Sequence, residues 1–228
     1  MIRLERRDAK RSAGGELAAA LDRPAPGSSH RLVLVRHAEP EADARGRCYG
    51  KLDVDLSEAG RSAARTLGRV GRAWRWDALR VSPRRRTRET ARALDFDAPM
   101  TLDDDLVELD FGDLEGKSYA QVEAEYPEIY AQWMREPTRV RFPGGESHAD
   151  MRARTRRFLA RESTRGAPGS PCRSLVVTHG GVIRTVLAEL LEMPPEALFR
   201  LHISHLGISV VDFHAGTPVV RLVNGTVS

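Results

Sequence analysis

The chain has 228 residues, of which 41% are hydrophobic and 30% charged, as in globular proteins that bury a full core. Its formal net charge is +4, and only three of its 36 basic residues are lysines, so the positive charge is nearly all guanidinium, which suits an anionic ligand. Two distant cysteines and the lack of any long apolar run argue against a disulfide scaffold, a cysteine zinc site and a transmembrane helix.

Residues 1–29 mix charged residues with alanine and glycine and end in the segment Pro24–Ser29. This composition predicts a flexible N-terminal tail, and no signal peptide is recognisable in it. We expect deletion of the tail to leave activity within about twofold, because the motifs described below lie beyond it. The remaining residues, 30–228, are predicted to form one domain of a cytoplasmic protein.

Apolar runs and helical spacing predict the following elements in chain order. Strands are expected at 31–35, 79–81 and 174–178, with a short extended piece around 105–109 and two further apolar runs at 208–213 and 218–223. Helices are expected from the N-cap Ser57 towards Trp74, over 84–94, Tyr119–Met134 and Ala149–Glu162, over 182–191, and briefly after Pro195. Strands alternating with helices predict a three-layer α/β/α fold with a mainly parallel central sheet.

Two of the predicted strands end in a histidine, and strand ends are where α/β proteins build their sites. His37 follows the first strand and His179 follows the strand at 174–178. A histidine that is neutral near pH 7 can attack a phosphoryl group, whose charge arginines such as Arg36 can neutralise. Glu108 lies in an apolar segment, where a carboxylic acid can be held ready to protonate a leaving alkoxide. These residue types together predict phosphoryl chemistry.

Four segments, in order, resemble the motifs of the histidine phosphatase superfamily, the phosphoglycerate mutase-like or RHG-motif enzymes. They are Arg36-His37-Ala38-Glu39, Ser82-Pro83-x-x-Arg86-x-x-Glu89-Thr90-Ala91, Leu106-x-Glu108-x-x-x-Gly112-x-x-Glu115-Gly116 and Val177-Thr178-His179-Gly180-Gly181. The resemblance spans about residues 31–224, and Ala38 stands where glycine is usual.

The resemblance implies a role for each matching residue. His37 is implied to be the nucleophile that becomes phosphohistidine, with His179 steadying the transferring phosphoryl group. Arg36 and Arg86 are implied to bind the substrate phosphate, and Glu108 to act as the proton donor. The fold implied includes a small helical flap, about residues 112–148, over the C-terminal ends of the strands. The enzyme implied is a metal-independent phosphomonoesterase of the histidine acid phosphatase type, with no cofactor.

Neighbouring residues predict which kind of member this is. A phosphoglycerate mutase-type phosphotransferase (isomerase) is the alternative. Mutases of this family have an asparagine shortly after the first motif, but Asp43 stands near that position here. The interval from Glu108 to His179 also leaves little room for the insertion that mutases carry. Hydrolysis is therefore favoured. The segment Arg45–Leu56 resembles α-ribazole phosphatases, which predicts α-ribazole 5'-phosphate as substrate and a place in cobalamin biosynthesis. A non-catalytic phospho-ligand-binding member and a protein phosphatase stay open.

Other patterns are interpreted as structural. His202 and His205 could suggest a metal pair, but no carboxylate or cysteine lies near them in sequence, so packing or surface roles are favoured. The arginines between 152 and 165 are interpreted as the wet face of a helix, not as a nucleic-acid contact. Tyr119, Tyr126, Tyr130 and Trp133 are mostly assigned to the core of the flap, although they could stack on a flat base. The expected partner is a small-molecule phosphate ester, with no nucleic acid or membrane, for a monomer or homodimer.

Overall fold

The computed structural model describes residue 21 and residues 24–167 and 170–226. Its strands are β1 (His30–Arg36), β2 (Ala78–Val81), β3 (Met100–Leu102), β4 (Cys172–Thr178), β5 (Ile208–His214) and β6 (Thr217–Gly225). They form one sheet in the order β3-β2-β4-β1-β5-β6, in which β5 is antiparallel to both of its neighbours and the other pairings are parallel. The predicted mainly parallel sheet is confirmed.

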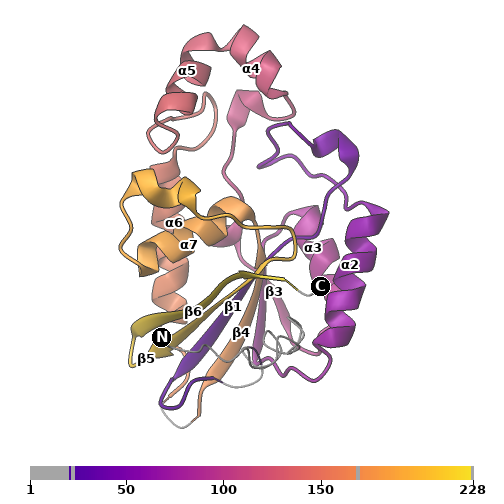
Figure 1. Ribbon diagram of the computed structural model, residues 1–228, viewed down its shortest axis with the longest axis vertical. Helices are drawn as coiled ribbons and strands as arrows, with labels where there is room; N and C mark the ends of the chain where they lie inside the picture. The colour runs from indigo at the N-terminus through magenta and orange to yellow at the C-terminus, as the bar shows by residue number, and fades with distance from the viewer. Residues whose placement is uncertain (1–20, 22–23, 168–169, 227–228) are drawn as a thin grey trace, which may run out of the picture.

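Helices cover both faces of the sheet, which confirms the three-layer prediction (Figure 1). α2 (Glu58–Val70) and α3 (Arg85–Leu94) pack on one face, and α6 (His148–Glu162) and α7 (Gly180–Leu190) on the other. Along β1, Val33 and Val35 point into the first of these cores, and Leu32 and Leu34 into the second. This alternation explains why β1 is a continuous apolar run, since both of its faces are buried.

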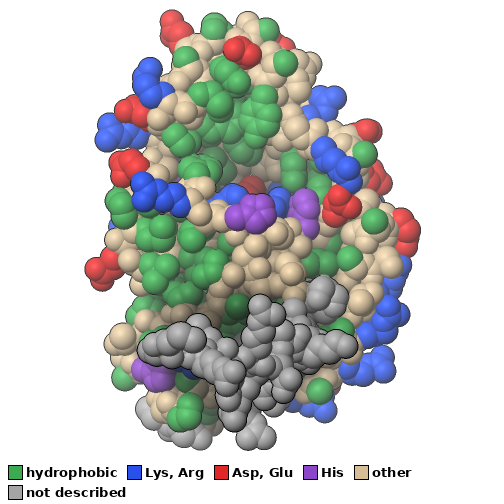
Figure 2. Space-filling view, in the orientation of Figure 1, with side chains coloured by type: hydrophobic (Ala, Val, Ile, Leu, Met, Phe, Trp, Pro, Cys, Tyr) green, Lys and Arg blue, Asp and Glu red, His purple; other side chains and the backbone are tan. Residues whose placement is uncertain are grey.

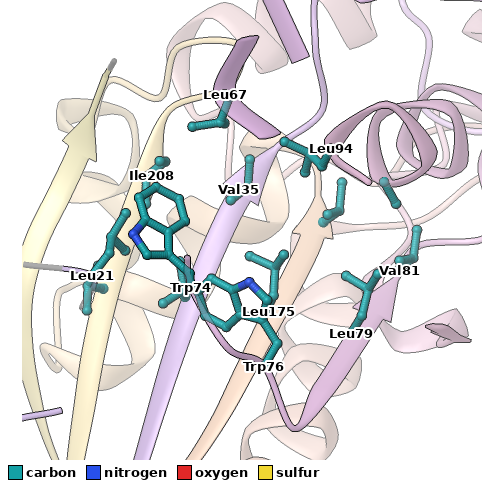
Figure 3. Close-up of a cluster of buried hydrophobic side chains, with 14 residues drawn as sticks. Leu21, Val35, Leu67, Trp74, Trp76, Leu79, Val81, Leu94, Leu175 and Ile208 are labelled. Carbon is teal, nitrogen blue, oxygen red and sulfur yellow. The ribbon is translucent and has the colours of Figure 1, made fainter. Parts of the chain in front are cut away.

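The core beneath α2 and α3 contains Trp74, Trp76 and the side chain of Leu21 (Figure 3). Leu21 is fully buried, and its carbonyl accepts a hydrogen bond from Nη2 of Arg173. The backbone amide of Ser29 also donates to the carbonyl of Phe213 on β5. Leu21, which lies in the predicted tail, is therefore packed in an apolar core. The rest of that prediction, on residues 1–20 and 22–23, lies outside the described residues.

Helix starts follow the sequence signals closely. Oγ of Ser57 accepts a hydrogen bond from the amide of Gly60, as expected for an N-cap, and Ser147 and Asp150 form a capping box at α6. The helix expected over Tyr119–Met134 is instead two helices, α4 (Tyr119–Glu125) and α5 (Pro127–Arg135). The break falls at Tyr126, because a residue that precedes proline disfavours the helical conformation.

The short extended piece expected around 105–109 does not pair as a strand, although Val107 has an extended backbone. Asp104–Leu106 forms a 3₁₀ helix, in which the side chain of Asp103 accepts a hydrogen bond from the amide of Asp105. The strand in this part of the chain is β3, and all three of its residues are exposed, so it carries no burial pattern to reveal it. The remaining 3₁₀ helices are Ala42–Ala44, Gly112–Leu114 and Pro195–Arg200.

The predicted flap region contains α4 and α5, which lie beyond the end of the sheet (Figure 1). They pack around a separate apolar cluster, whose buried members are Cys48, Leu114, Val122, Val140 and Phe142. No helix in the described ranges has both the length and the apolar character needed to cross a bilayer.

Candidate active site

Parallel pairing of β1 with β4 brings the two predicted histidines together. Arg36 lies opposite Thr178 in the register of the two strands, so the residues that follow, His37 and His179, emerge side by side. Their ring centroids are 5.3 Å apart and the rings lie at 63° to each other. His37 is buried, with 1% of its surface exposed, and His179 is fully buried.

Hydrogen bonding assigns the proton of His37. Nδ1 lies 2.8 Å from the carbonyl oxygen of Ala38, and because a carbonyl only accepts, Nδ1 carries the proton. Burial, with the charges of Arg86 and Arg36 as smaller causes, lowers the pKa of His37 well below 6.5. The ring is therefore neutral near pH 7, and its Nε2 keeps a free lone pair.

His179 has the opposite tautomer. Nε of Arg86 donates to Nδ1 of His179 at 3.2 Å, so the proton lies on Nε2, which donates to Oγ of Ser82 at 2.8 Å. Burial, followed by the charge of Arg86, lowers the pKa of His179 well below 6.5. Ser82 directly follows β2, so the ends of the adjacent strands β2 and β4 share one hydrogen-bonded group, beside His37 at the end of β1.

Arg86 is fully buried, and backbone carbonyls surround its guanidinium. Nη1 donates to the carbonyl of Leu52, and Nη2 donates to those of Tyr49 and Gly50. The guanidinium also lies over the ring of Tyr49, 5.1 Å from its centroid. Of its five N–H groups, one on Nη1 is left for another acceptor.

Glu115 holds the loop that surrounds Arg86. Its carboxylate accepts hydrogen bonds from the amides of Gly50, Lys51 and Leu52, at 2.7 to 3.1 Å, and from the amide of Phe111 at 3.0 Å. The interpretation of Glu115 as structural agrees with these contacts. The segment that resembles α-ribazole phosphatases thus has a physical role in placing Arg86.

Arg36 has one N–H group without a hydrogen-bond partner among the described residues. Nη1 donates to the carbonyl of Ile203 at 2.7 Å, whereas Nε is buried and has no hydrogen-bond partner among the described residues. A buried donor without a partner is costly, because it has given up water without replacement. An anion bound beside Arg36 would satisfy it.

Glu108 reaches the same place from a different part of the chain. Its Oε2 accepts a hydrogen bond from the amide of Gly181 at 3.0 Å, and its Oε1 accepts one from the amide of Leu109. A Cβ atom on Gly181 would lie 2.3 Å from Oε1, so this position leaves no room for a side chain. Gly181 therefore places Glu108 against the first turn of α7, close to His179.

The five predicted site residues are thus brought together, but the sequence reasoning missed His205. Its ring centroid is 5.3 Å from that of His37, and its Nε2 is buried with no partner among the described residues. Burial, followed by the charge of Arg36, lowers its pKa to about 4. His202 is exposed and bonds Ser204, so the two histidines do not act as a pair.

Among the residues described, no three or more His, Cys, Asp or Glu side chains are grouped to hold a metal ion.

A cavity of about 200 Å³ begins beside Glu108 and Gly181 and runs beneath the helices α4 and α5. Its walls include Tyr119 and Trp133, whose rings are 5.5 Å apart, while Tyr126 and Tyr130 pack against the apolar cluster of the flap. Figure 2 shows histidine and basic side chains gathered in the hollow, with hydrophobic side chains above them. The site therefore joins a cationic floor to an apolar, aromatic wall.

Comparison with known proteins identifies relatives of the chain. Residues 32–226 match the sequence profile of the histidine phosphatase superfamily (branch 1). The adenosylcobalamin/alpha-ribazole phosphatase of Salmonella typhimurium is 31% identical over 197 residues, which cover 85% of this chain and 96% of that protein. The structure of a mycobacterial glucosyl-3-phosphoglycerate phosphatase has a TM-score of 0.75 and 28% identity, covering 87% of this chain and all of that one.

A bifunctional protein of Mycobacterium tuberculosis is 36% identical over 208 residues. The match covers 89% of this chain but 56% of that protein, so the chain spans little more than half the length of this relative.

Proposed function

Because the chain belongs to the histidine phosphatase superfamily, we propose that it hydrolyses phosphomonoesters through a phosphohistidine intermediate on His37. The observation that carries the proposal is the state of this histidine. Its ring is neutral, its Nδ1 proton is bound by the carbonyl of Ala38, and its Nε2 is free beside the cations of Arg36 and Arg86. A buried nucleophile surrounded by fixed positive charge suits a dianionic phosphoryl group.

The reaction has two displacements. Nε2 of His37 attacks phosphorus as the bond to the ester oxygen breaks, and the carboxylic acid of Glu108 gives that oxygen its proton. Water then attacks the phosphohistidine, Glu108 takes a proton from the water, and the P–N bond breaks to regenerate neutral His37. Arg36, through its unpartnered Nε, and Arg86, through its remaining N–H, would hold the phosphoryl oxygens in both steps. His179 would steady the group from beside His37.

The first substrate to test is α-ribazole 5'-phosphate. The segment Arg45–Leu56 supports it, as does the name of the Salmonella relative. Tyr119 and Trp133 offer flat faces on the cavity wall, against which a benzimidazole could stack. The proposal places the ester phosphate at His37 and the base beneath the flap.

The test measures inorganic phosphate released from α-ribazole 5'-phosphate, 3-phosphoglycerate and p-nitrophenyl phosphate, with a chelator present. Wild type is compared with His37→Ala and with the matched control His202→Ala, whose ring is exposed. Preference for the ribazole ester, lost only in His37→Ala, would support both the chemistry and the substrate. Turnover of the activated ester alone would support the chemistry and discard the substrate. No phosphate release from any ester would refute the hydrolase.

The role of Glu108 has its own test. We predict that Glu108→Gln slows glycerol 2-phosphate by about 10²- to 10⁴-fold, the usual contribution of a general acid. p-Nitrophenyl phosphate should be slowed far less, because its leaving group needs no proton. Measured kcat/KM values for the two esters decide, and equal slowing of both would remove Glu108 from the acid role.

A further inference from the structure

A second cavity, which contains none of the proposed site residues, is rich in arginine. It has a volume of about 480 Å³ and lies where the C-terminal ends of α2 and α3 meet. A Cβ atom on Gly68 would lie 2.2 Å from the carbonyl oxygen of Leu94, so the two helices touch there. The cavity's charged lining residues are Arg65, Arg69, Arg72, Arg75, Arg92, Asp95 and Asp97, with a formal charge of +3 from five arginines less two aspartates. Sites for small ligands usually have volumes of about 300–1,000 Å³, so this arginine-lined cavity is large enough for one.

The sequence spaces three of these arginines along one side of the chain. Arg65 and Arg69 are four residues apart on α2, and Arg72 follows three residues later, with its amide donating to the carbonyl of Arg69. Side chains at this spacing are neighbours on a helix, and like charges so placed repel. An anion bound among them removes that repulsion, so the spacing favours a ligand with negative charge.

The protein itself neutralises few of these guanidinium groups. Arg65 forms an exposed ion pair with Glu58 at 2.7 Å, and Nη2 of Arg69 donates to Oγ1 of Thr66. In the described part of the chain, no carboxylate lies within 4 Å of four of them: Arg69, Arg72, Arg75 and Arg92.

The helix ends account for only some of this charge. A helix C-terminus has partial negative charge, which favours cations in its last turn. Arg69 and Arg92 lie in the last turns of α2 and α3 and so have a structural reason for their positions. Arg72 and Arg75 lie beyond the last turn of α2, and both are exposed. These two arginines therefore add positive charge that the helix ends do not require.

Aromatic rings line the same cavity. Trp74 and Phe96 are lining residues, and their ring centroids are 6.0 Å apart. Trp76, which lies in the core beside Trp74 (Figure 3), is 5.9 Å from Phe96 and holds it from another side. Gly71 makes room for both lining rings, because a Cβ atom there would lie 2.3 Å from Trp74 and 2.7 Å from Phe96. Phe96 is half-buried, so part of a rigidly held ring is left for a flat group to pack against.

We propose that the arginine-lined cavity is a second ligand site, which binds a nucleoside triphosphate. Guanidinium groups bind phosphates through paired hydrogen bonds, and the several negative charges of a triphosphate match the excess of arginine over aspartate. The base packs against Phe96, and the carboxylates of Asp95 and Asp97 accept hydrogen bonds from ribose hydroxyls. Leu94 is eight residues beyond Arg86 on α3, roughly 12 Å along the helix, so this ligand is separate from the ester at His37.

Calorimetric titration of the full chain tests the proposal, with ATP, inorganic tripolyphosphate and a single-stranded thymidine dodecamer as probes. Every protein carries His37→Ala, so no probe is hydrolysed and the result does not depend on the proposed function. The first comparison is between the parent, the double variant Arg72→Gln/Arg75→Gln and the control Arg135→Gln/Arg200→Gln. Arg135 and Arg200 are exposed and lie outside the cavity, so the control removes the same charge elsewhere. Phe96→Leu is titrated as well, and thermal unfolding confirms that each variant is folded.

We expect one ATP to bind per chain, and Arg72→Gln/Arg75→Gln to raise its Kd at least about 10-fold, as for loss of charge-assisted hydrogen bonds. The control should keep the Kd within about twofold, because salt screens charges more than about 10 Å away. Phe96→Leu should weaken ATP at least about fivefold, as for loss of base stacking, and leave tripolyphosphate unchanged.

Three results would overturn the proposal. The first is a folded parent chain that does not bind ATP, or an ATP affinity that the two cavity substitutions leave unchanged. The second is tripolyphosphate binding as tightly as ATP, which would remove the nucleoside from the site. The third is a dodecamer that binds more tightly than ATP with the same dependence on Arg72 and Arg75, which would assign the surface to nucleic acid instead.

Discussion

Gly181 gives a sharp test of how the site is built, and we predict that Gly181→Ala removes most activity without unfolding the protein. The added Cβ would lie 2.3 Å from Oε1 of Glu108 and 3.0 Å from its Cδ, whereas ordinary contacts begin near 3.4 Å. The carboxylate must therefore move by about 1 Å. It can do so at little cost to the fold, because it is the end of a flexible side chain.

The magnitude follows from this displacement. Misplacing a catalytic group by about 1 Å costs on the order of 10²-fold in rate, and complete loss of a general acid about 10²- to 10⁴-fold. Moving Glu108 weakens its hydrogen bond with the amide of residue 181, which costs stability. Because alanine is favoured over glycine in a helix by about 0.5–1 kcal/mol, the substitution offsets part of that cost. We expect the free energy of unfolding to stay within about 1 kcal/mol of wild type.

The assay compares kcat/KM for glycerol 2-phosphate and p-nitrophenyl phosphate in wild type, Gly181→Ala and Glu108→Gln, with urea denaturation of each. Gly181→Ala should resemble Glu108→Gln, losing about 10²-fold on the alkyl ester and much less on the activated one. Full activity on the alkyl ester would show that Glu108 needs no such placement. A loss of several kcal/mol in stability would show that Gly181 serves the fold instead.

Two further predictions concern stability. Leu21→Ala should lower the free energy of unfolding by about 2–3 kcal/mol, because it removes a leucine from a packed core, and kcat/KM should be unchanged. A change below about 0.5 kcal/mol, measured by urea denaturation, would contradict the packing of Leu21. Stability should also fall as pH drops below 6.5, because the depressed pKa values of His37 and His179 make the unfolded chain bind more protons. Each of the two histidines lowers the free energy of unfolding by up to about 1.4 kcal/mol per pH unit below 6.5. Urea denaturation at pH 7.5, 6 and 5 should therefore show a shallower dependence of unfolding free energy on pH for His37→Ala than for wild type. An equal dependence would mean that His37 is charged in the folded protein.

Local patterns predicted several of the elements and the strand ends at which two of the proposed site residues lie. Continuous apolar runs revealed β1 and β4, since strands buried on both faces need no alternation. Ser57 marked the start of α2, because an N-cap is a property of a few adjacent residues. His37 and His179 could be assigned to one site because both follow strands that a parallel sheet ends at the same edge.

Other features depend on contacts between distant parts of the chain, and no local pattern specifies them. The β3-β2-β4-β1-β5-β6 order places Ser82 against His179, and the packing of the loop between the 3₁₀ helix Pro195–Arg200 and β5 brings His205 to His37. The missed strand β3 is exposed, and a strand without burial has no hydrophobic signal.

The sequence by itself determined that the chain is an α/β protein, and it placed Arg36, His37 and His179 at strand ends, while the motif resemblance singled out Arg86 and Glu108. These are properties of short segments, set by side-chain chemistry and hydrophobic periodicity. Only the tertiary structure decided that the carbonyls of Tyr49, Gly50 and Leu52 surround Arg86, that Gly181 makes room for Glu108, and that Leu21 joins the core. Each of these is a contact between residues far apart in the chain, and its geometry exists only once the whole sheet and its helices have packed.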